Sequence, residues 1–338
     1  GAEIVLSNAY HLYLRPGMEL VQRLGGLHQF MGWSRPILTD SGGFQAFSMG
    51  SLKEVDESGI RFRSHIDGSE HNFTPGLATR NQEGLGADII MCLDQCIAFG
   101  SSKDDVIKAM ERTHSWARMC HDMHTKSSSG DLQALFGIVQ GGTFPDLREA
   151  SAEHITGMPF DGYAIGGLAV GESKSEMYQI TSNVTEILPQ DKPRYLMGVG
   201  SPEDLVEAIA RGVDMCDCVL PTRVARNGAL FTSKGRINIL NRRFSEMDEP
   251  LCDDCDCYSC SKFTAAYLWH LFKAKEILGL RLASVHNLRF IVRLMQEARS
   301  AIIENRFNHF RTSFWESYMP TDESVRLSQK DKWLLNRG

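Results

Sequence analysis

The sequence lacks any apolar run of the roughly 18 residues that a membrane-spanning helix requires. It also lacks the opening pattern of a secretory signal, in which a charged segment precedes an apolar one. We therefore expect a cytoplasmic protein with no membrane partner. In such a compartment the nine cysteines are more typical of buried, catalytic or metal-bound thiols than of disulfides.

The chain also has no excess of positive charge, because its formal net charge is -6. That value alone argues against a nucleic-acid partner, but the charges are unevenly distributed. Residues 221–311 contain 15 Lys and Arg residues against 9 Asp and Glu residues, so the acidic excess lies elsewhere. A basic segment on an acidic protein is typical either of a phosphate-binding surface or of solvated helices, and charge alone does not decide between them.

Short apolar runs alternate with longer amphipathic stretches, among them residues 103–124 and 201–213. Strand–helix alternation repeated this often predicts a parallel sheet covered by helices. The apolar runs are residues 3–11, 35–40, 87–94, 134–140, 162–167, 194–200 and 214–221.

Most of these runs end in polar or glycine-rich residues, and strand carboxyl ends are where a (β/α)8 barrel builds its active site. An open doubly wound sheet binds ligands only at its switch point. The spread of such residues over many strand ends therefore predicts a TIM-like (β/α)8 barrel. Seven runs are visible where a closed barrel needs eight, and the chain starts abruptly in a strand pattern. We therefore expect that the first strand is missing from this chain or that one strand is unrecognised.

The alternation stops near residue 228, where residues 231–244 are typical of a hairpin. Two helices are expected after it, near 261–278 and 285–305. We therefore predict three parts: a barrel over 1–227, a zinc-binding subdomain with C-terminal helices over 228–318, and a polar tail over 319–338.

Residues 252–260, CDDCDCYSC, hold four of the nine cysteines. Two ligand sets suit a tetrahedral structural zinc ion. One is Cys252 with the three following cysteines; the other is those three cysteines with a distant histidine. Three thiolates and an imidazole carry less negative charge, which is easier to accommodate beside the neighbouring aspartates. His286, expected at the start of the last helix, is the favoured histidine, and His270 is its rival. Four further cysteines in apolar runs are expected to be small buried hydrophobes: Cys92, Cys96, Cys216 and Cys218.

Asp40, Asp94 and Asp217 each follow or end an apolar run. An aspartate at a strand end commonly caps a turn, but three at one barrel mouth favour a site. Two carboxylates at one site can serve as a nucleophile and an acid/base, a pair used for displacement at an anomeric carbon.

Amide and backbone groups of Gln140 and the Gly166–Gly167 turn suit the edge of a planar polar heterocycle. Phe44 and Met197 could contact its faces.

Several motifs that follow one another over nearly the whole chain resemble the tRNA-guanine transglycosylase, or queuine tRNA-ribosyltransferase, family. They are DSGGFQ, GIVQGG, GYAIGGLAVGE, RYLMGVG, DMCDCVLPTRVARNG, and CDCYSC followed by VHN. The resemblance implies a (β/α)8 barrel with a zinc-bearing insertion near the C-terminus. It also implies exchange of the wobble guanine of a tRNA anticodon for a deazaguanine, through a covalent ribosyl-enzyme intermediate and without a nucleotide cofactor.

The same resemblance assigns roles to residues. Asp217 corresponds to the nucleophile and Asp40 to the general acid/base. The base-binding residues would be Ser41, Phe44, Asp94, Gln140, Gly167, Leu168 and Met197, and the anticodon contacts Arg223 and Arg226. The ligands of one structural Zn2+ per subunit would be Cys255, Cys257, Cys260 and His286, with Cys252 a spare thiol.

The GGLAVGE segment resembles the bacterial members, in which Ala169 and Val170 would admit a small substituent and exclude a large one. This implies 7-aminomethyl-7-deazaguanine, the queuosine precursor, as the incoming base. Phe263, Tyr267 and His270 lie on one predicted helix face, and the resemblance implies a homodimer through them. Packing of that face on the barrel is the alternative.

Two other functions were considered. A non-catalytic tRNA-binding partner subunit would be recognised by loss of Asp40 or Asp217, and both are present. A barrel glycosidase would need surface aromatics along a sugar-binding groove, and it would leave the basic, cysteine-bearing segment unexplained.

Overall fold

The computed structural model describes residues 1–48, 51–130 and 132–321, and the chain divides into two compact units. The larger unit comprises residues 2–199 and 211–217. The smaller unit comprises residue 1, residues 200–210 and the chain from residue 218 onward. Most of the predicted polar tail lies outside the described residues, and the predicted functional division at residue 227 stays a prediction.

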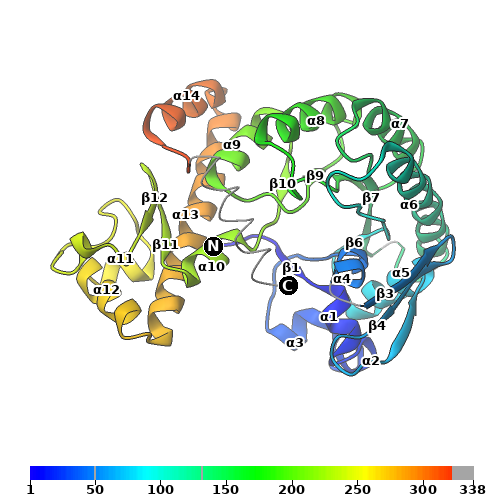
Figure 1. Ribbon diagram of the computed structural model, residues 1–338, viewed down its shortest axis with the longest axis horizontal. Helices are drawn as coiled ribbons and strands as arrows, with labels where there is room; N and C mark the ends of the chain where they lie inside the picture. The colour runs from blue at the N-terminus through cyan, green and yellow to red at the C-terminus, as the bar shows by residue number, and fades with distance from the viewer. Residues whose placement is uncertain (49–50, 131, 322–338) are drawn as a thin grey trace. The chain divides into compact units, whose positions relative to one another are not determined.

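The larger unit is built on a seven-stranded parallel sheet in the order β1-β2-β6-β7-β8-β9-β10. Each predicted apolar run contains one of these strands, so the parallel α/β architecture is confirmed. The sheet curls as a partial barrel with helices along its outer side (Figure 1). The strands are β1 (Val5–Ser7), β2 (Ile37–Thr39), β6 (Ile89–Met91), β7 (Ala134–Val139), β8 (Gly162–Ile165), β9 (Arg194–Leu196) and β10 (Met215–Cys216).

The helices of this unit begin where the sequence supplies capping side chains. Ser102 accepts a hydrogen bond from the Asp105 N–H, and Ser173 and Glu176 form a capping box, so the first N–H groups of two helices are satisfied. The helices are α1 (Ala9–Leu14), α2 (Met18–Arg23), α3 (Gly26–Met31), α4 (Gly43–Ser48), α5 (Pro75–Leu85), α6 (Lys103–His124), α7 (Pro145–Thr156) and α8 (Lys174–Ile187).

The prediction over residues 3–11 was only partly correct. The strand ends at Ser7 because the Asn8 side chain accepts the His11 N–H and starts α1. An antiparallel sheet of β3 (Ser51–Asp56), β4 (Gly59–Arg63) and β5 (Glu70–Phe73) was not predicted at all. Its strands carry many charged residues and so lack the apolar pattern that revealed the parallel strands.

Close packing in the parallel sheet depends on two strand glycines. A Cβ atom at Gly137 would lie 2.5 Å from a ring carbon of Phe160, and one at Gly162 would lie 2.4 Å from a ring carbon of Phe136. The phenylalanine rings therefore occupy the space that side chains at these positions would need. Such tight packing is expected of a sheet that is buried on both faces.

The smaller unit contains the predicted hairpin, in which Leu230 pairs with Ile237 and Phe231 with Arg236. Its helices differ from the prediction, because a positive φ at Lys275 ends α12 and α13 begins well before His286. The elements are α9 (Pro202–Ala210), α10 (Leu220–Arg226), β11 (Ala229–Thr232), β12 (Gly235–Asn238), η1 (Arg242–Phe244), α11 (Tyr258–Lys262), α12 (Ala265–Lys273), α13 (Ile277–Ile303) and α14 (Phe307–Ser317).

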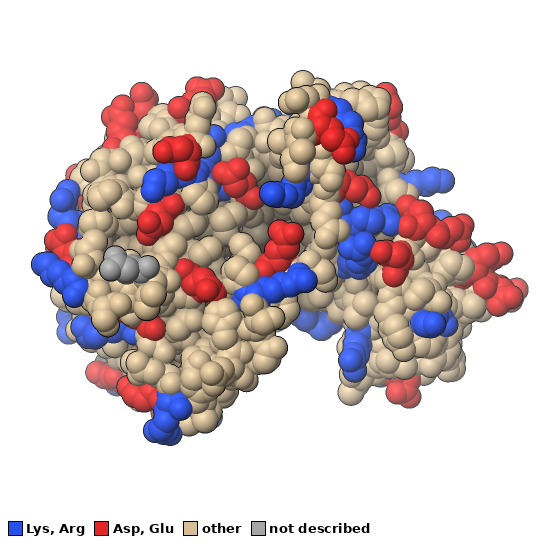
Figure 2. Space-filling view, turned by 180° about the vertical axis from the view of Figure 1, so that it is seen from behind, with Lys and Arg blue, Asp and Glu red and all other residues tan. Residues whose placement is uncertain are grey.

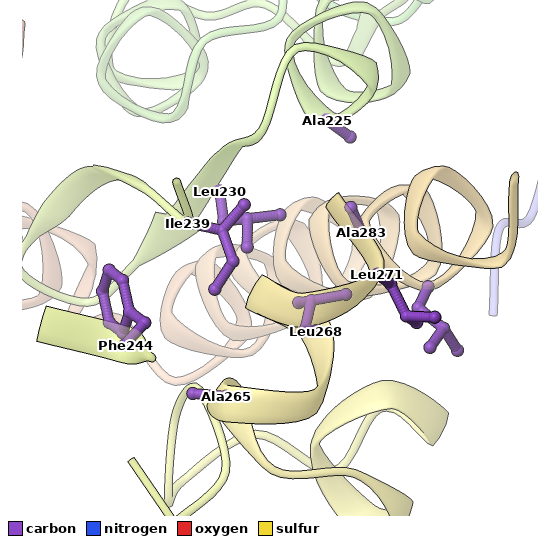
Figure 3. Packing of buried hydrophobic residues seen from close by; sticks show 9 residues of the cluster. Ala225, Leu230, Ile239, Phe244, Ala265, Leu268, Leu271 and Ala283 are labelled. Atoms are coloured by element: carbon purple, nitrogen blue, oxygen red, sulfur yellow. The ribbon is translucent and has the colours of Figure 1, made fainter. Parts of the chain in front are cut away.

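Asn287 on α13 ties these elements together, and its side chain is fully buried. Its Oδ1 accepts the Phe231 N–H at 2.9 Å, and its Nδ2 donates to the carbonyls of Pro221 and Ala229. One amide thus joins α13 to β11 and to the first turn of α10. Nine buried apolar residues from α10, the hairpin, η1, α12 and α13 form a core (Figure 3). Among the described residues, no helix has the length and apolar character needed to cross a membrane.

Leu268 lies in this core at 2% exposure, whereas Leu288 on α13 is 45% exposed. We expect Leu268→Ala to lower the free energy of unfolding by about 2–5 kcal/mol, because it leaves a cavity between α12 and α13. Leu288→Ala should change it by less than about 0.5 kcal/mol. Urea unfolding followed by circular dichroism measures both, and equal losses would contradict the assignment of this core.

Candidate active site and metal cluster

Asp40 follows β2 and is only 8% exposed. Its carboxylate accepts the Ala9 N–H at 2.8 Å and the Asn8 Nδ2 at 2.5 Å, both at the start of α1. Burial raises the pKa of Asp40 to about 7; the Ala9 hydrogen bond opposes this rise, and the charges of Asp217 and Asp94 add to it. At neutral pH this carboxyl group can therefore both donate and accept a proton.

Asp94 follows β6, and two other predicted site residues donate hydrogen bonds to it. Gln140, at the end of β7, donates its Nε2 to one carboxylate oxygen at 2.7 Å, and Ser41 donates its hydroxyl to the other at 3.2 Å. All three side chains are buried. Burial raises the pKa of Asp94, while these hydrogen bonds partly counteract the rise. The result is a polar group of fixed orientation, which is suited to recognising a ligand's hydrogen-bond donors.

Asp217 follows β10 and is half-buried, so its carboxylate is more accessible than the other two. Its Oδ1 accepts the Tyr195 hydroxyl at 2.5 Å and the Gly198 N–H at 2.9 Å. Tyr195 was not predicted as a site residue. A signal was present, because Tyr195 lies in the same apolar run as the predicted Met197, two residues before it.

Arg148 on α7 is a second residue that was not predicted. It is fully buried, and its guanidinium donates to the carbonyls of Val139 and Gly142 at the end of β7 and of Gly166 and Gly167 at the end of β8. Burial lowers its pKa to about 10, so it is still cationic at neutral pH. A charged residue in an amphipathic helix is usually solvated, so the sequence pattern does not predict that Arg148 is buried.

The turn after β8 is held from its other side by Glu172, which is 4% exposed. Its carboxylate accepts the N–H groups of Ala169, Val170 and Gly171. Ala169 has a φ of 59°, a left-handed conformation that such multiple hydrogen bonds can maintain. The backbone of this turn is thus fixed before any ligand arrives.

The structure therefore brings together five of the predicted residues at the carboxyl ends of parallel strands: Asp40, Ser41, Asp94, Gln140 and Asp217. Gly167 lies against Gln140, since a Cβ added at Gly167 would be 2.4 Å from the Gln140 Oε1. Phe44 is 49% exposed on α4, Met197 is partly exposed and Leu168 is buried. Within the described residues no contact joins Phe44 to Met197, so their stacking role stays a prediction.

In the smaller unit, four predicted ligands form a buried cluster that could hold a metal ion: Cys255, Cys257, Cys260 and His286. Their ligand atoms lie within 4.8 Å of one another, and His286 Nδ1 is 3.7, 3.6 and 3.3 Å from the three sulfurs. His286 Nε2 lies 2.7 Å from the Phe231 carbonyl. With the proton on Nε2, the lone pair of Nδ1 faces the sulfurs, which is the tautomer that a metal ligand requires.

Of the two ligand sets considered, the one with histidine is the cluster found, and Cys252 packs beside it. His286 comes from the middle of α13 and not from a helix start, which corrects that prediction. Of the four cysteines expected to be buried hydrophobes, Cys92 and Cys96 are buried, whereas Cys216 and Cys218 are only partly so.

The aspartates beside the cysteines are paired with arginines of α13. Arg289 donates to both oxygens of Asp256 at 2.7 Å, and Arg293 contacts Asp254 at 3.1 Å. These exposed pairs add little stability, but they offset negative charge next to a thiolate cluster. Basic and acidic side chains are likewise interspersed on the visible face of each unit (Figure 2). The predicted RNA contacts Arg223 and Arg226 are exposed on α10, and among the described residues neither has an acidic partner within ion-pair distance.

The pKa of Asp40 predicts a pH-dependent stability. Its folded pKa of about 7 exceeds the ordinary value of 3.8, so the folded state retains a proton that the unfolded state releases. The contribution of Asp40 to stability is thus full below about pH 4, falls as the pH rises from about 4 to about 7, and is lost above that. Asp40→Asn should remove this loss and gain about 1–3 kcal/mol over wild type between pH 5 and pH 8. Urea titrations at both values test it, with exposed Asp104→Asn as control. If the free energies of unfolding of Asp40→Asn and wild type differ by the same amount at pH 5 and pH 8, the prediction is wrong.

The cluster predicts that Cys260→Ser, but not Cys252→Ser, loses bound metal. Cys260 supplies a ligand atom, whereas Cys252 lies outside the set. Because metal binding contributes directly to folding, Cys260→Ser should also unfold the smaller unit at lower urea concentration. Mass spectrometry of the purified proteins measures metal content. Metal loss in both variants would mean that Cys252 is a ligand.

Comparisons with known proteins agree with this geometry. A family model described as queuine tRNA-ribosyltransferase matches residues 1–320. A queuine tRNA-ribosyltransferase of Dehalococcoides mccartyi is 51% identical over 335 residues, covering 99% of this chain and 84% of that protein. One of Caldanaerobacter subterraneus is 54% identical over 318 residues, covering 94% and 84%. One of Herpetosiphon aurantiacus is 53% identical over 330 residues, covering 98% and 83%. The chain therefore belongs to the queuine tRNA-ribosyltransferase family.

Proposed function

We propose that this protein is a tRNA-guanine transglycosylase, which exchanges the wobble guanine of a tRNA anticodon for a 7-deazaguanine base. The observation that carries the proposal is a pair of carboxylates in contrasting environments. Asp40 is buried with a pKa of about 7, whereas Asp217 is partly accessible and has one oxygen held by two donors. Such a contrast suits one residue to proton transfer and the other to nucleophilic attack.

In the proposed reaction a carboxylate oxygen of Asp217 attacks C1′ of the wobble nucleotide. The glycosidic C1′–N bond breaks, its electron pair leaves with guanine, and Asp40 supplies the proton that neutralises the departing base. The product is a covalent bond between Asp217 and the ribose. In the second half the incoming base attacks C1′, Asp40 accepts its proton, and the Asp217 carboxylate is released.

The base would lie against Asp94, Gln140 and Ser41, whose mutual hydrogen bonds hold them in place before binding. Backbone groups of Gly167 and Leu168 would read its edge, with Phe44 and Met197 at its faces. We propose 7-aminomethyl-7-deazaguanine as the incoming base. The support is the GGLAVGE segment, whose backbone is fixed by Glu172 so that Val170 cannot easily withdraw.

The metal cluster supports a structural Zn2+ ion, one per subunit. Three sulfurs and one imidazole nitrogen complete a tetrahedral site and leave no open position for chemistry. The ion would bind the segment after the hairpin to α13, while Arg223 and Arg226 would contact the anticodon.

A homodimer is proposed through Tyr258 of α11, Tyr267 of α12 and Phe263 between them. Phe263 has an extended backbone and lies outside α12, so it does not share one helix with Tyr267 and His270 as predicted. The Phe263 and Tyr267 rings stack with centroids 5.2 Å apart, and Tyr258 packs edge-on against Phe263. Tyr258 and Tyr267 are 58% and 38% exposed in the single chain. Exposed aromatic clusters are typical of interface centres. Action on tRNA would place the protein in the cytoplasm.

The proposal predicts that Asp217→Asn abolishes the covalent RNA adduct, because an amide is a poor nucleophile. The matched control is Asp214→Asn on the same segment, since Asp214 is exposed and only accepts the Arg194 N–H. Each protein is incubated with tRNA that has a wobble guanine, and the covalent protein–tRNA adduct is detected on a denaturing gel. An adduct with Asp217→Asn would remove Asp217 from the nucleophile role.

The same assay distinguishes the alternative function and the incoming base. A metal-loaded, folded protein that binds tRNA but forms no adduct and exchanges no labelled guanine would be a non-catalytic partner. Competition between 7-aminomethyl-7-deazaguanine and queuine for release of the adduct tests the base. Preference for queuine would overturn the assignment of the precursor.

A further inference from the structure

The two oxygens of Asp217 have unequal surroundings. Oδ1 accepts both the Tyr195 hydroxyl at 2.5 Å and the Gly198 N–H at 2.9 Å. Among the described residues no group donates a hydrogen bond to Oδ2. One oxygen is thus anchored by two donors from the end of β9, and the other keeps its lone pairs for a ligand.

We propose that Tyr195 is a positioning residue which, with the Gly198 N–H, fixes the Asp217 carboxylate so that Oδ2 is the attacking atom. This inference rests on the proposed function, because it concerns the same nucleophile. It adds a residue and an atom to that mechanism. Tyr195 donates to Oδ1, the oxygen of Asp217 that does not attack, and does not contact the substrate.

Tyr195 is held rigidly enough to serve this purpose. It is 1% exposed and pairs with Ala164 of β8 on one side and Met215 of β10 on the other. Its backbone is therefore held between two strands and its ring is buried, so the hydroxyl is in place before a ligand binds. Burial and the charge of Asp217 raise the Tyr195 pKa far above its ordinary value, so the hydroxyl keeps its proton and stays a donor.

Gly198 supplies the second donor through its backbone conformation. Its φ of 75° lies in the left-handed region, which lets the chain turn directly after β9 and direct this N–H to Asp217. The two donors thus come from the same strand end, one from a side chain and one from the backbone.

The physical effect follows from carboxylate rotation. The terminal torsion of an aspartate is broad and nearly two-fold, so an unheld carboxylate presents either oxygen over a range of angles. Two donors on Oδ1 remove that freedom before tRNA binds. Attack within a near-attack geometry then requires less reorganisation. In the step itself Oδ2 bonds to C1′, the C1′–N electron pair leaves with the base, and Tyr195 retains its proton throughout.

The chain offers a matched pair of variants for the test. Tyr195→Phe removes the donor but keeps the ring. Tyr163→Phe is the control, because Tyr163 is 3% exposed on neighbouring β8 and its hydroxyl donates to the Met158 carbonyl at 3.0 Å. Both variants lose one buried hydroxyl and one hydrogen bond, but only the first loses contact with Asp217.

The measurements are the single-turnover rate of adduct formation at saturating tRNA, the Kd for tRNA, the KM for the free base and the thermal midpoint. We expect Tyr195→Phe to slow adduct formation about 10- to 100-fold, the effect of losing a hydrogen bond to a charged group. Its Kd and KM should stay within about two-fold of wild type, since ground-state binding does not use this hydroxyl. Tyr163→Phe should form adduct at the wild-type rate.

Three results would overturn the inference. Adduct formation by Tyr195→Phe at the wild-type rate would show that the hydroxyl is dispensable. Equal slowing in both variants, or a loss of tRNA affinity that parallels the slowing, would assign the hydroxyl to folding. If wild type itself forms no adduct, the proposed function fails and the positioning role fails with it, a result distinct from the other two.

Discussion

Parallel pairing of seven strands is the constraint on which the larger unit depends. It places Asp40, after β2, and Asp217, after β10, at the carboxyl ends of strands in one sheet, although the two residues are 177 positions apart in sequence. No local preference would gather Asp40, Asp94 and Asp217, since each follows a strand of only two or three residues. The glycines at 137 and 162 make the sheet tight enough for this alignment to be rigid, because aromatic rings fill the space above them.

The alignment places acidic side chains in a buried environment, which disfavours their charged forms. Burial raises the pKa of Asp40 and of Asp94, the charges of Asp217 and Asp94 raise that of Asp40 further, and hydrogen bonds only partly offset these rises. Each carboxylate has different hydrogen-bond donors. Asp40 accepts from the start of α1, Asp94 from polar side chains, and Asp217 from a phenol and a backbone N–H. Different partners make three similar groups chemically distinct.

Much of this was predictable from sequence, for identifiable reasons. Apolar runs between amphipathic segments revealed the seven parallel strands of the described residues. Short cysteine spacing, with the family resemblance that selected His286, identified the four residues of the cluster that could hold a metal ion. The antiparallel sheet escaped because its strands place charged residues between buried apolar ones such as Ile60, Phe62 and Phe73, and so contain no continuous apolar run. Arg148 and Tyr195 escaped because their roles depend on what lies opposite them in space, which a helix pattern or a strand pattern does not contain.

Two adjacent residues of α13 have opposite tasks. His286 faces the sulfur cluster, and Asn287 holds the hairpin and the first turn of α10. Because His286 and Asn287 are adjacent on one helix, an ion bound at the cluster would also fix the position of the Asn287 amide, which supports α10. An ion bound there would thus help to hold the helix that carries Arg223 and Arg226 without contacting either arginine.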